Sequence, residues 1–404
     1  MPDIGFTNLF LVSLIAFLAP LTVALVPRLK VPAVVVEILA GVVLGPAVLG
    51  VVDADLPVQV LAVVGLSFLL FMVGLELDVR RLRGKVLRGA ALGYLLSLLL
   101  GTLVGLGAAG AGWVQSPLLV AIALSATSLG LVVPVLKDAD QVESDLGRAT
   151  VAGATLADVA AVLLLTLLFS AGSATVGARV ILLLTFFGFV AVTGAAVVLT
   201  ERWQGLRDVL LDLQDTTAEI RVRAAVVLLA GFVALAERFG LETILGALLA
   251  GAVVGAVDRD ASSHPQFRTK LEAIGYGFLV PVFFISSGIR LDVAGLVGNP
   301  AALARTPLFL AALLLVRGVP VLLLRHQLTR RETVAAGLLQ ATSLPFLVTA
   351  TTIGVDAGLM TGVTAASLVA AGILSVTVFP ATALAVLRGS STAATVPEPV
   401  PIGG

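Results

Sequence analysis

Long apolar segments separated by short polar loops run along the whole chain. Stretches of about 17–25 mostly apolar residues are long enough to cross the hydrocarbon core of a bilayer as helices. We count about thirteen, at residues 4–27, 31–51, 57–77, 86–111, 116–136, 147–170, 177–200, 221–239, 241–257, 271–289, 302–324, 332–354 and 358–387. The pattern therefore predicts an all-α integral membrane protein with about thirteen transmembrane helices.

Basic residues are spread unevenly over the loops between these segments. If the N-terminus lies outside, the inner loops hold about twenty Lys and Arg residues and the outer loops about four. An excess of Lys and Arg marks the cytoplasmic loops of membrane proteins. We therefore predict an outer N-terminus, a cytoplasmic C-terminus and one transmembrane domain over residues 1–390.

The composition narrows the class of protein further. Charged residues make up 12% of the chain, about half of the share that is usual in soluble domains. The zero formal net charge argues against nucleic acid as a partner, and the lack of cysteine excludes disulfides and thiol chemistry. Two histidines are too few for an ordinary transition-metal site, and no nucleophile–base pair or phosphate loop indicates an enzyme or a cofactor. The strong preference for Arg over Lys suggests a GC-rich bacterial genome, and hence a bacterial inner membrane.

Two polar stretches stand apart from the apolar segments. In residues 201–219, Trp203, Leu206, Leu210 and Leu213 recur at helical spacing between charged residues. This spacing predicts a short helix that lies at the membrane surface and links two bundles, with an ordinary polar linker as the alternative. Residues 391–404 are rich in Gly, Ser, Thr and Pro, and we expect a disordered cytoplasmic tail, too short for a nucleotide-binding domain.

The chain repeats itself at a nearly constant offset. Three pairs of matching segments occur in the same order, with offsets of 210, 214 and 215: Ala40–Gly45 with Ala250–Gly255, Gly74–Val79 with Gly288–Val293, and Ala126–Leu129 with Ala341–Leu344. The repeats cover residues 31–171 and 241–387, and seven predicted helices separate corresponding members. Because that number is odd, the two five-helix repeats are inverted in the membrane, an arrangement typical of secondary transporters with a midplane site.

The third repeated segment, Ala-Thr-Ser-Leu, interrupts two membrane spans. Pro345 follows its second copy and removes a backbone hydrogen bond. Open backbone at membrane depth is tolerated only beside protein or water. We therefore predict two broken helices that cross near Thr127 and Thr342, with their half-helix ends beside an ion. The alternative is that these hydroxyls only bond to the carbonyl four residues back.

Two charged residues lie deep inside predicted spans, and the repeat does not duplicate either. An ionised Asp at the centre of a membrane helix costs about 2.5–3.5 kcal/mol, so Asp158 predicts a site for a cation or a proton. Its counterpart in the second repeat is Ile373, and the counterpart of Arg317 in the first is Thr102. One repeat thus supplies a buried anion and the other a buried cation, unless Arg317 snorkels to the membrane surface.

These residues resemble the motifs of the monovalent cation:proton antiporter superfamily, most closely its Kef-type branch of potassium and sodium/proton antiporters. The similar segments are Pro32–Pro46, Gly65–Asp78, Leu245–Gly251 and Pro281–Gly288, and the likeness extends from about residue 30 to about residue 385. The resemblance implies thirteen or so helices, a six-helix core that carries two crossed broken helices, and a domain that forms a homodimer.

The resemblance also implies roles for individual residues. Asp158 is the residue that binds the ion and the proton, and Arg317 compensates charge at the crossing. The position before Asp158 usually carries Asp, Asn or Gln in the family, whereas Ala157 has no polar group. The candidates are, for cation and proton binding, Asp158, Thr127 and Ser128, and, for charge compensation at the crossing, Arg317, Thr342 and Ser343.

Three other carboxylates are candidates for an entrance funnel or for pH sensing, namely Glu37, Glu76 and Glu219. Glu37 lies about one and a half turns into its helix, where a pair with Arg28 or Lys30 is the alternative. Glu76 and Glu219 lie at helix ends, where carboxylates are often solvated or suit the helix dipole.

We conclude from the sequence that this is a secondary antiporter that exchanges sodium or potassium, bound at Asp158, for protons. Since Ala157 offers no second carrier and arginine stays protonated, one cation should exchange for one proton. Two alternatives remain, a cation channel that uses the same site and an organic-anion transporter in which Arg317 holds the substrate.

Overall fold

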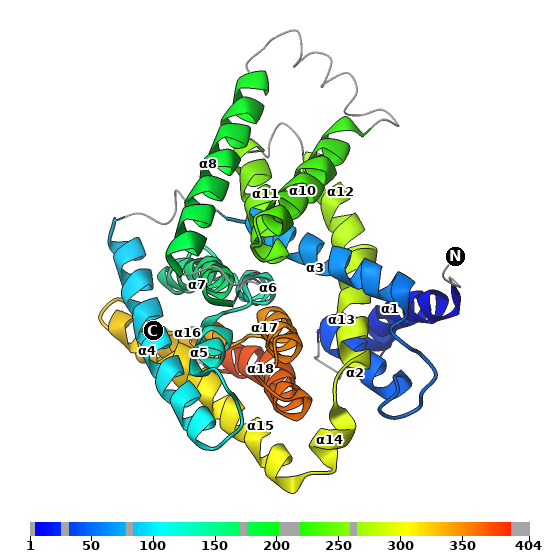
Figure 1. Ribbon diagram of the computed structural model, residues 1–404. Coiled ribbons are helices and arrows are strands. Elements are labelled where there is room, and N and C mark those ends of the chain that lie inside the picture. Colours follow the sequence, from blue (N-terminus) through cyan, green and yellow to red (C-terminus); the bar gives the residue numbers. More distant parts are fainter. Residues whose placement is uncertain are drawn as a thin grey trace, which may run out of the picture.

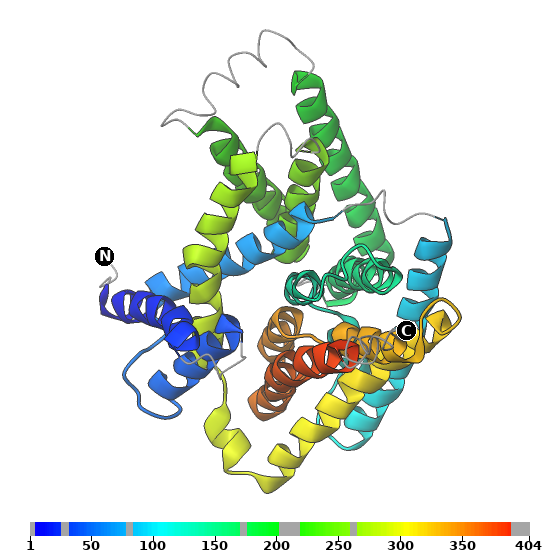
Figure 2. The same cartoon turned by 180° about the vertical axis from the view of Figure 1, so that it is seen from behind.

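The computed structural model describes residues 5–25, 32–77, 84–169, 176–201, 219–258 and 265–388. Nearly all of these residues are helical, and their only β-type pairing is an isolated bridge between Val114 and Met360. Figures 1 and 2 show helices that cross one another at many angles, with the last helix, α18, in the middle of the lower group. The predicted all-α class is confirmed.

The helices follow the apolar segments of the sequence. In chain order they are α1 (Thr7–Leu25), α2 (Ala33–Leu44), α3 (Leu56–Leu75), α4 (Gly84–Gly110), α5 (Pro117–Ser125), α6 (Leu129–Asp138), α7 (Asp145–Phe169), α8 (Val176–Glu201), α10 (Ile220–Arg238), α11 (Thr243–Val257), α12 (Pro265–Ile274), α13 (Val280–Ile289), α14 (Val293–Val297), α15 (Pro300–Leu313), α16 (Arg330–Gln340), α17 (Pro345–Asp356) and α18 (Gly362–Arg388).

Two membrane segments are not regular α-helices throughout. The π-helix Gly275–Leu279 joins α12 to α13, and the π-helix Leu314–Gly318 follows α15 and leads into a 3₁₀-helix, Val319–Leu324. π-Helical turns inside longer helices are often found at functional sites. The second of them carries Arg317.

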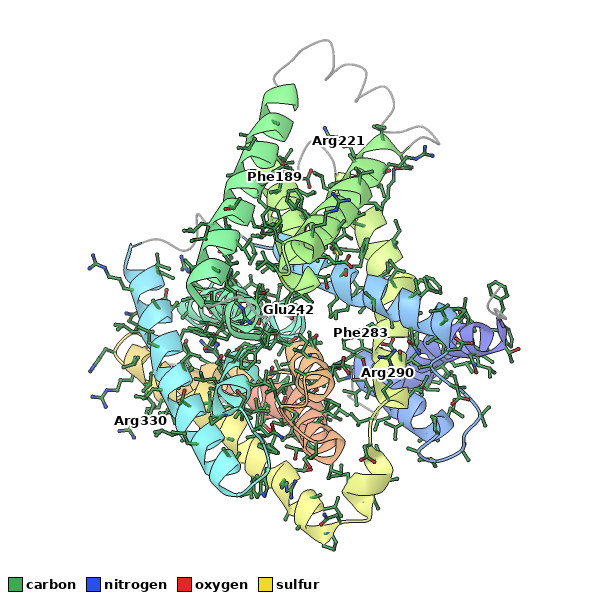
Figure 3. The ribbon with its side chains drawn as sticks, in the orientation of Figure 1. Phe189, Arg221, Glu242, Phe283, Arg290 and Arg330 are labelled. Carbon is green, nitrogen blue, oxygen red and sulfur yellow. The ribbon has the colours of Figure 1, made fainter. Side chains whose placement is uncertain are left out.

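The multi-pass character of the chain is confirmed. In the described residues, nine helical stretches are long and apolar enough to cross a membrane, and α2, Pro117–Val133 and α11 are shorter apolar helices. The count of thirteen crossings and the orientation of the N-terminus stay predictions. Figure 3 shows Arg221 and Arg330 at the rim of the molecule.

The predicted extent of the second segment, residues 31–51, is wrong. α2 ends at Leu44 because Gly45 takes up an extended backbone (φ −73°, ψ 179°) and Pro46, which has no N–H, follows it. A hydrogen bond of 2.8 Å from the Gly50 N–H to the Gly45 carbonyl then closes a turn. The predicted surface helix and tail, like Arg28 and Lys30, lie outside the described residues.

The helices form two groups, which contact each other where α11 meets α7 and where α2 meets α18. The crossing bundle consists of α4–α7 and α15–α18, in which α4 packs on α5 and α7, and α18 on α15, α16 and α17. The scaffold group consists of α1–α3 and α10–α13, in which α2 packs on α13 and α3 packs on α11. α8 contacts α7 of the crossing bundle and α11 of the scaffold group.

Repeated glycines allow the two main scaffold contacts to be backbone on backbone. A Cβ atom at Gly41 would clash with the Ile285 carbonyl, and one at Gly251 would clash with the Phe71 carbonyl. The offset of 210 relates the two glycines, and the offset of 214 relates their partners. The contact of α2 with α13 is thus the symmetry mate of the contact of α11 with α3. Small residues permit such close approach between membrane helices.

Candidate functional site

The crossing of two broken helices lies at the centre of the crossing bundle. α5 ends at Ser125 and α6 begins at Leu129, while α16 ends at Gln340 and α17 begins at Pro345. Between the halves the backbone is open, with ψ of 155° at Ala126. Proline explains the second break, because it has no N–H to continue α16.

The two breaks touch each other. The Ser128 N–H donates a hydrogen bond of 2.9 Å to the Thr342 carbonyl. The Thr127 hydroxyl donates one of 2.7 Å to the Gln340 carbonyl. Each break thus satisfies polar backbone of the other, away from water. The predicted crossing near Thr127 and Thr342 is confirmed.

Asp158 of α7 closes the first break. Its side chain is buried, and its two oxygens accept hydrogen bonds from the Thr127 N–H, at 3.2 Å, and from the Leu129 N–H, at 3.4 Å. These N–H groups stand at the start of α6, where the helix has no internal acceptors for them and its dipole favours negative charge. The bonds orient both carboxylate oxygens and leave each with capacity to accept from a further ligand.

Arg317 is the most deeply buried charged side chain in the described residues, at 1% exposure. Its guanidinium donates to four neutral acceptors, which are the Thr127 hydroxyl at 2.8 Å, the Ser97 hydroxyl at 3.2 Å, the Gly153 carbonyl at 3.3 Å and the Gln340 amide oxygen at 3.0 Å. None of these contacts is an ion pair with Asp158. The guanidinium therefore acts on the carboxylate through space, across Thr127.

The hydroxyls of the first break have different roles. The Thr127 hydroxyl accepts from Arg317 and donates to the Gln340 carbonyl, so both its proton and a lone pair are in use. The Ser128 side chain is half-buried, and no hydrogen bond of its hydroxyl occurs within the described part of the chain. Of the two hydroxyls at this break, that of Ser128 is therefore the one that no described group occupies.

The second break is lined by neutral groups. The Thr342 hydroxyl donates a hydrogen bond of 3.1 Å to the Leu338 carbonyl, four residues back. This local bond is the alternative role that the sequence indicated for these hydroxyls. The Ser343 N–H donates to the hydroxyl of Ser375 at 3.2 Å, and the one proton of that hydroxyl is shared between the Ser343 carbonyl, at 3.1 Å, and the Gly372 carbonyl of its own helix, at 2.8 Å. The Ser343 hydroxyl is buried and has no hydrogen-bond partner among the described residues.

The three candidate funnel residues belong to different elements of the fold. Glu37 is buried in α2, and no hydrogen bond or ion pair reaches it from the rest of the described chain. Glu76 is half-buried directly after α3. Glu219 forms an ion pair of 2.8 Å with Lys270 of α12. Glu76 and Glu219 both lie beside α12, because Arg268 of that helix donates to the carbonyl of Leu75, directly before Glu76.

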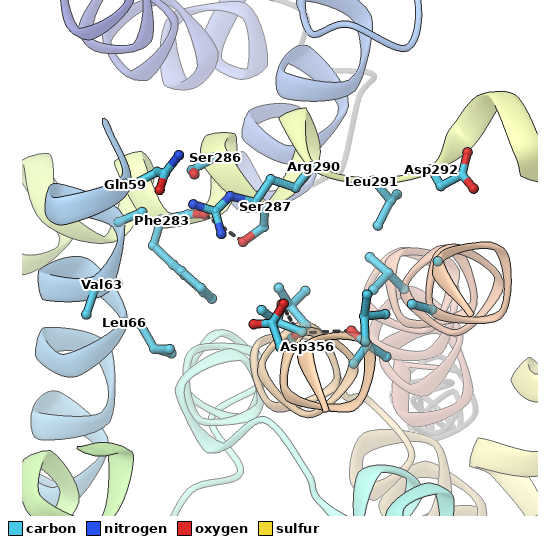
Figure 4. A pocket seen from close by; sticks show the side chains of 18 residues that line it. Gln59, Val63, Leu66, Phe283, Ser286, Ser287, Arg290, Leu291, Asp292 and Asp356 are labelled. Atoms are coloured by element: carbon cyan, nitrogen blue, oxygen red, sulfur yellow. Dashed lines mark hydrogen bonds between the residues drawn. The ribbon is translucent and has the colours of Figure 1, made fainter. Parts of the chain in front are cut away.

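A cavity of about 190 Å³ lies between the scaffold group and the crossing bundle on the predicted outer side. α3 and α13 form one wall, and α17 and α18 form the other. Figure 4 shows Arg290 at the end of α13 and Asp356 at the end of α17, on opposite sides of this space. The cavity separates the two groups of helices beyond the crossing.

Several residues of the crossing were not anticipated from the sequence. Gln340, Ser97 and Gly153 bind Arg317, and Ser375 closes the second break. A glutamine directly before the repeated Ala-Thr-Ser-Leu segment, inside an apolar span, was the one local signal. The others are small residues that membrane helices commonly contain.

Crossed broken helices in inverted repeats are typical of secondary transporters. The chain belongs to the sodium/hydrogen exchanger family, whose transmembrane family model matches residues 13–389. The prediction of an antiporter-type family is thereby confirmed.

Relatives in two Bacillus species carry antiporter names. The chain is 31% identical over 369 residues to YjbQ of Bacillus subtilis, which carries the name putative Na⁺/H⁺ antiporter. The aligned region covers 88% of this chain and 58% of YjbQ. It is 28% identical over 299 residues to the Na⁺/H⁺-K⁺ antiporter GerN of Bacillus cereus, covering 73% of this chain and 74% of GerN. The chain thus spans little more than half of the first relative.

The fold is similar to that of a solved antiporter. The structure of the sodium proton antiporter MjNhaP1 from Methanocaldococcus jannaschii at pH 8 matches with a TM-score of 0.68 and 17% identity, covering 94% of this chain and 98% of that one. At this level of identity the match supports the fold alone.

Proposed function

We propose that the chain is a secondary active antiporter that exchanges a monovalent cation, sodium or potassium, for protons. The observation that carries this proposal is the geometry of Asp158, a buried carboxylate held by two backbone N–H groups and not paired with Arg317. Such a carboxylate can bind a proton or, when ionised, a cation. The two states exclude each other, and this competition couples the fluxes.

The surroundings supply the other ligands that a monovalent cation needs. Hard cations prefer oxygen ligands, and the Ser128 hydroxyl and the open carbonyls of both breaks are oxygens within the crossing. The C-terminal ends of α5 and α16 add partial negative charge, while Arg317 offsets part of the carboxylate charge once the cation has left. We place the cation at Asp158 and Ser128, with Thr127 as the bridge to Arg317.

The number of titratable groups fixes the proposed stoichiometry. Asp158 carries one proton or one monovalent cation, Ala157 carries neither, and the guanidinium of Arg317 stays protonated. One cation should therefore exchange for one proton, with no net charge moved. The proposal includes a homodimer in a bacterial inner membrane with the N-terminus outside, and Glu37, Glu76 and Glu219 as candidates for pH response.

The test is proton flux in liposomes that contain the purified protein and a pH-sensitive dye, with each alkali cation added in turn. Asp158→Asn keeps the size of the side chain but cannot ionise, so exchange should fall to the level of empty liposomes. Asp145→Asn is the matched control, because Asp145 lies exposed in the first turn of the same helix. Exchange that persists in Asp158→Asn would remove the proposed mechanism.

A further inference from the structure

Gln340 joins three separate elements at the crossing. Its carbonyl accepts from the Thr127 hydroxyl, and its side-chain oxygen accepts from Arg317 at 3.0 Å. Its amide also lies against Gly153 of α7, where an added Cβ atom would come within 2.5 Å of the Gln340 nitrogen. The side chain is buried, at 6% exposure. The absence of a side chain at Gly153 is thus what makes room for the glutamine.

The position of this amide relates it to Ala157. Gly153 and Ala157 are one helical turn apart on the same helix, and Asp158 follows directly. Ala157 is completely buried and has no polar atom to offer Arg317. The amide of Gln340 comes from a different helix, α16, and reaches the guanidinium over the neighbouring turn of α7.

We propose that Gln340 is a positioning residue that holds the guanidinium of Arg317 with a neutral acceptor, which the buried Ala157 cannot offer. It accepts an N–H of Arg317 with a neutral oxygen, so the guanidinium is held in place while its charge is not cancelled. The positive field then acts on Asp158 alone. This inference rests on the proposed function, in which Asp158 is the single carrier of the cation and the proton.

A carboxylate at position 340 would have the opposite effect. A guanidinium and a carboxylate at this distance form a charge-assisted pair, so Gln340→Glu would cancel the charge of Arg317. Ionised Asp158 would lose its nearby compensating charge, and exchange would need a more alkaline pH. A positive charge within about 4–6 Å lowers the pKa of a carboxyl group by about one to three pH units, and this effect would be lost.

The surroundings allow such a substitution to titrate. A cavity of about 230 Å³ reaches Gln340 and Arg317 from the predicted cytoplasmic side, between α4, α7, α16 and the 3₁₀-helix. The other titratable groups along it are Tyr94 near its base and Asp145 and Arg148 at its mouth.

α18, which also packs on α16, has no acidic or basic residue before Arg388. Arg317 is therefore the only charged group among the described residues that contacts the amide of Gln340 directly.

The experiment compares the pH profiles of cation-driven proton flux in liposomes for three substitutions. Gln340→Glu should move the profile by about one unit or more towards alkaline pH. Gln340→Met removes the neutral acceptor at similar volume, which frees an N–H of Arg317 to face Asp158, so its profile should move towards acidic pH. Gln327→Glu is the control, since it adds the same charge at the exposed mouth of the same cavity and should leave the profile in place.

A purely structural glutamine would behave differently. Gln340→Glu and Gln340→Met would then both lower the rate, and their pH profiles would not move in opposite directions. That result would overturn the inference. A shift in Gln327→Glu equal to that in Gln340→Glu would also overturn it. If Gln340→Glu does not fold, an unshifted profile in Gln340→Met overturns it equally. Asp158→Asn separates the two proposals. If that variant is inactive and the pH profiles of the Gln340 variants do not move, only the role of Gln340 is refuted.

Discussion

The two breaks at the crossing are built alike and closed by different side chains. At the first, the carboxylate of Asp158 on α7 accepts from two backbone N–H groups. At the second, the hydroxyl of Ser375 on α18 binds both the N–H and the carbonyl of Ser343. α7 and α18 are corresponding members of the two repeats. A neutral hydroxyl thus closes the second break, so a break of this kind can be closed without a charge, and the charge of Asp158 is what distinguishes the first break from the second.

Arg317 is the group that connects the two breaks, and its removal should have the largest effect. Arg317→Ala leaves four acceptors at the crossing without their donor, and an unsatisfied buried acceptor costs about 1–3 kcal/mol. We expect loss of exchange and a clearly lower unfolding temperature in detergent. Arg317→Lys keeps the charge but not the planar fork, so it should retain part of the exchange with an altered pH dependence. Full activity of the alanine variant would contradict the role of Arg317 at the crossing.

The corresponding serines of the two breaks provide a matched pair with a smaller expected effect. Ser128→Ala removes the available hydroxyl beside Asp158, and a hydrogen bond or ligand of this kind contributes about 0.5–1.5 kcal/mol. The half-saturating cation concentration should rise by up to about tenfold. Ser343→Ala removes a buried hydroxyl that has no partner among the described residues, so cation affinity should be unchanged. Equal effects of both substitutions would mean that the two breaks share the ion.

The smallest expected effect is that of the membrane potential, because we expect the potential to have no effect on exchange. Only the first break carries a titratable group, so one cation and one proton replace each other without net charge movement. Exchange rates and the reversal point should not change when the liposomes are clamped at different potentials with a permeant ion that the protein does not transport. A reversal point that follows the potential would mean that a second proton carrier exists, and would sharpen the search towards Glu37 or Glu76.

The sequence predicted the frame of this site and not the contacts inside it. The repeated Ala-Thr-Ser-Leu segment and Pro345 gave the two breaks, and the hydropathy of α7 gave the depth of Asp158. These are local signals, because a break and a buried charge each leave a mark within one apolar span. That Thr127 is an ion ligand stays a prediction; the sequence did not indicate that its hydroxyl binds Arg317 and the Gln340 carbonyl.

What escaped prediction depends on residues far apart in the chain. The partners of Arg317 come from α4, α5–α6, α7 and α16, and helical periodicity does not tell which distant side chain fills the space over Gly153. The π-helix that carries Arg317 has no local sequence mark either. The early end of α2 was readable in Gly45 and Pro46, because glycine and proline commonly end a helix.

The backbone contacts at Gly41 and Gly251 have a mechanical consequence for the scaffold group. Since the carbonyls of Ile285 and Phe71 occupy the space of the missing side chains, sliding either helix along its neighbour would press a neighbouring Cβ atom into a peptide group. Each of the pairs α2–α13 and α11–α3 is thus held in a single register. In the proposed antiporter, a movement that changes the side from which Asp158 is reached would therefore leave these two contacts intact and occur between the two groups of helices.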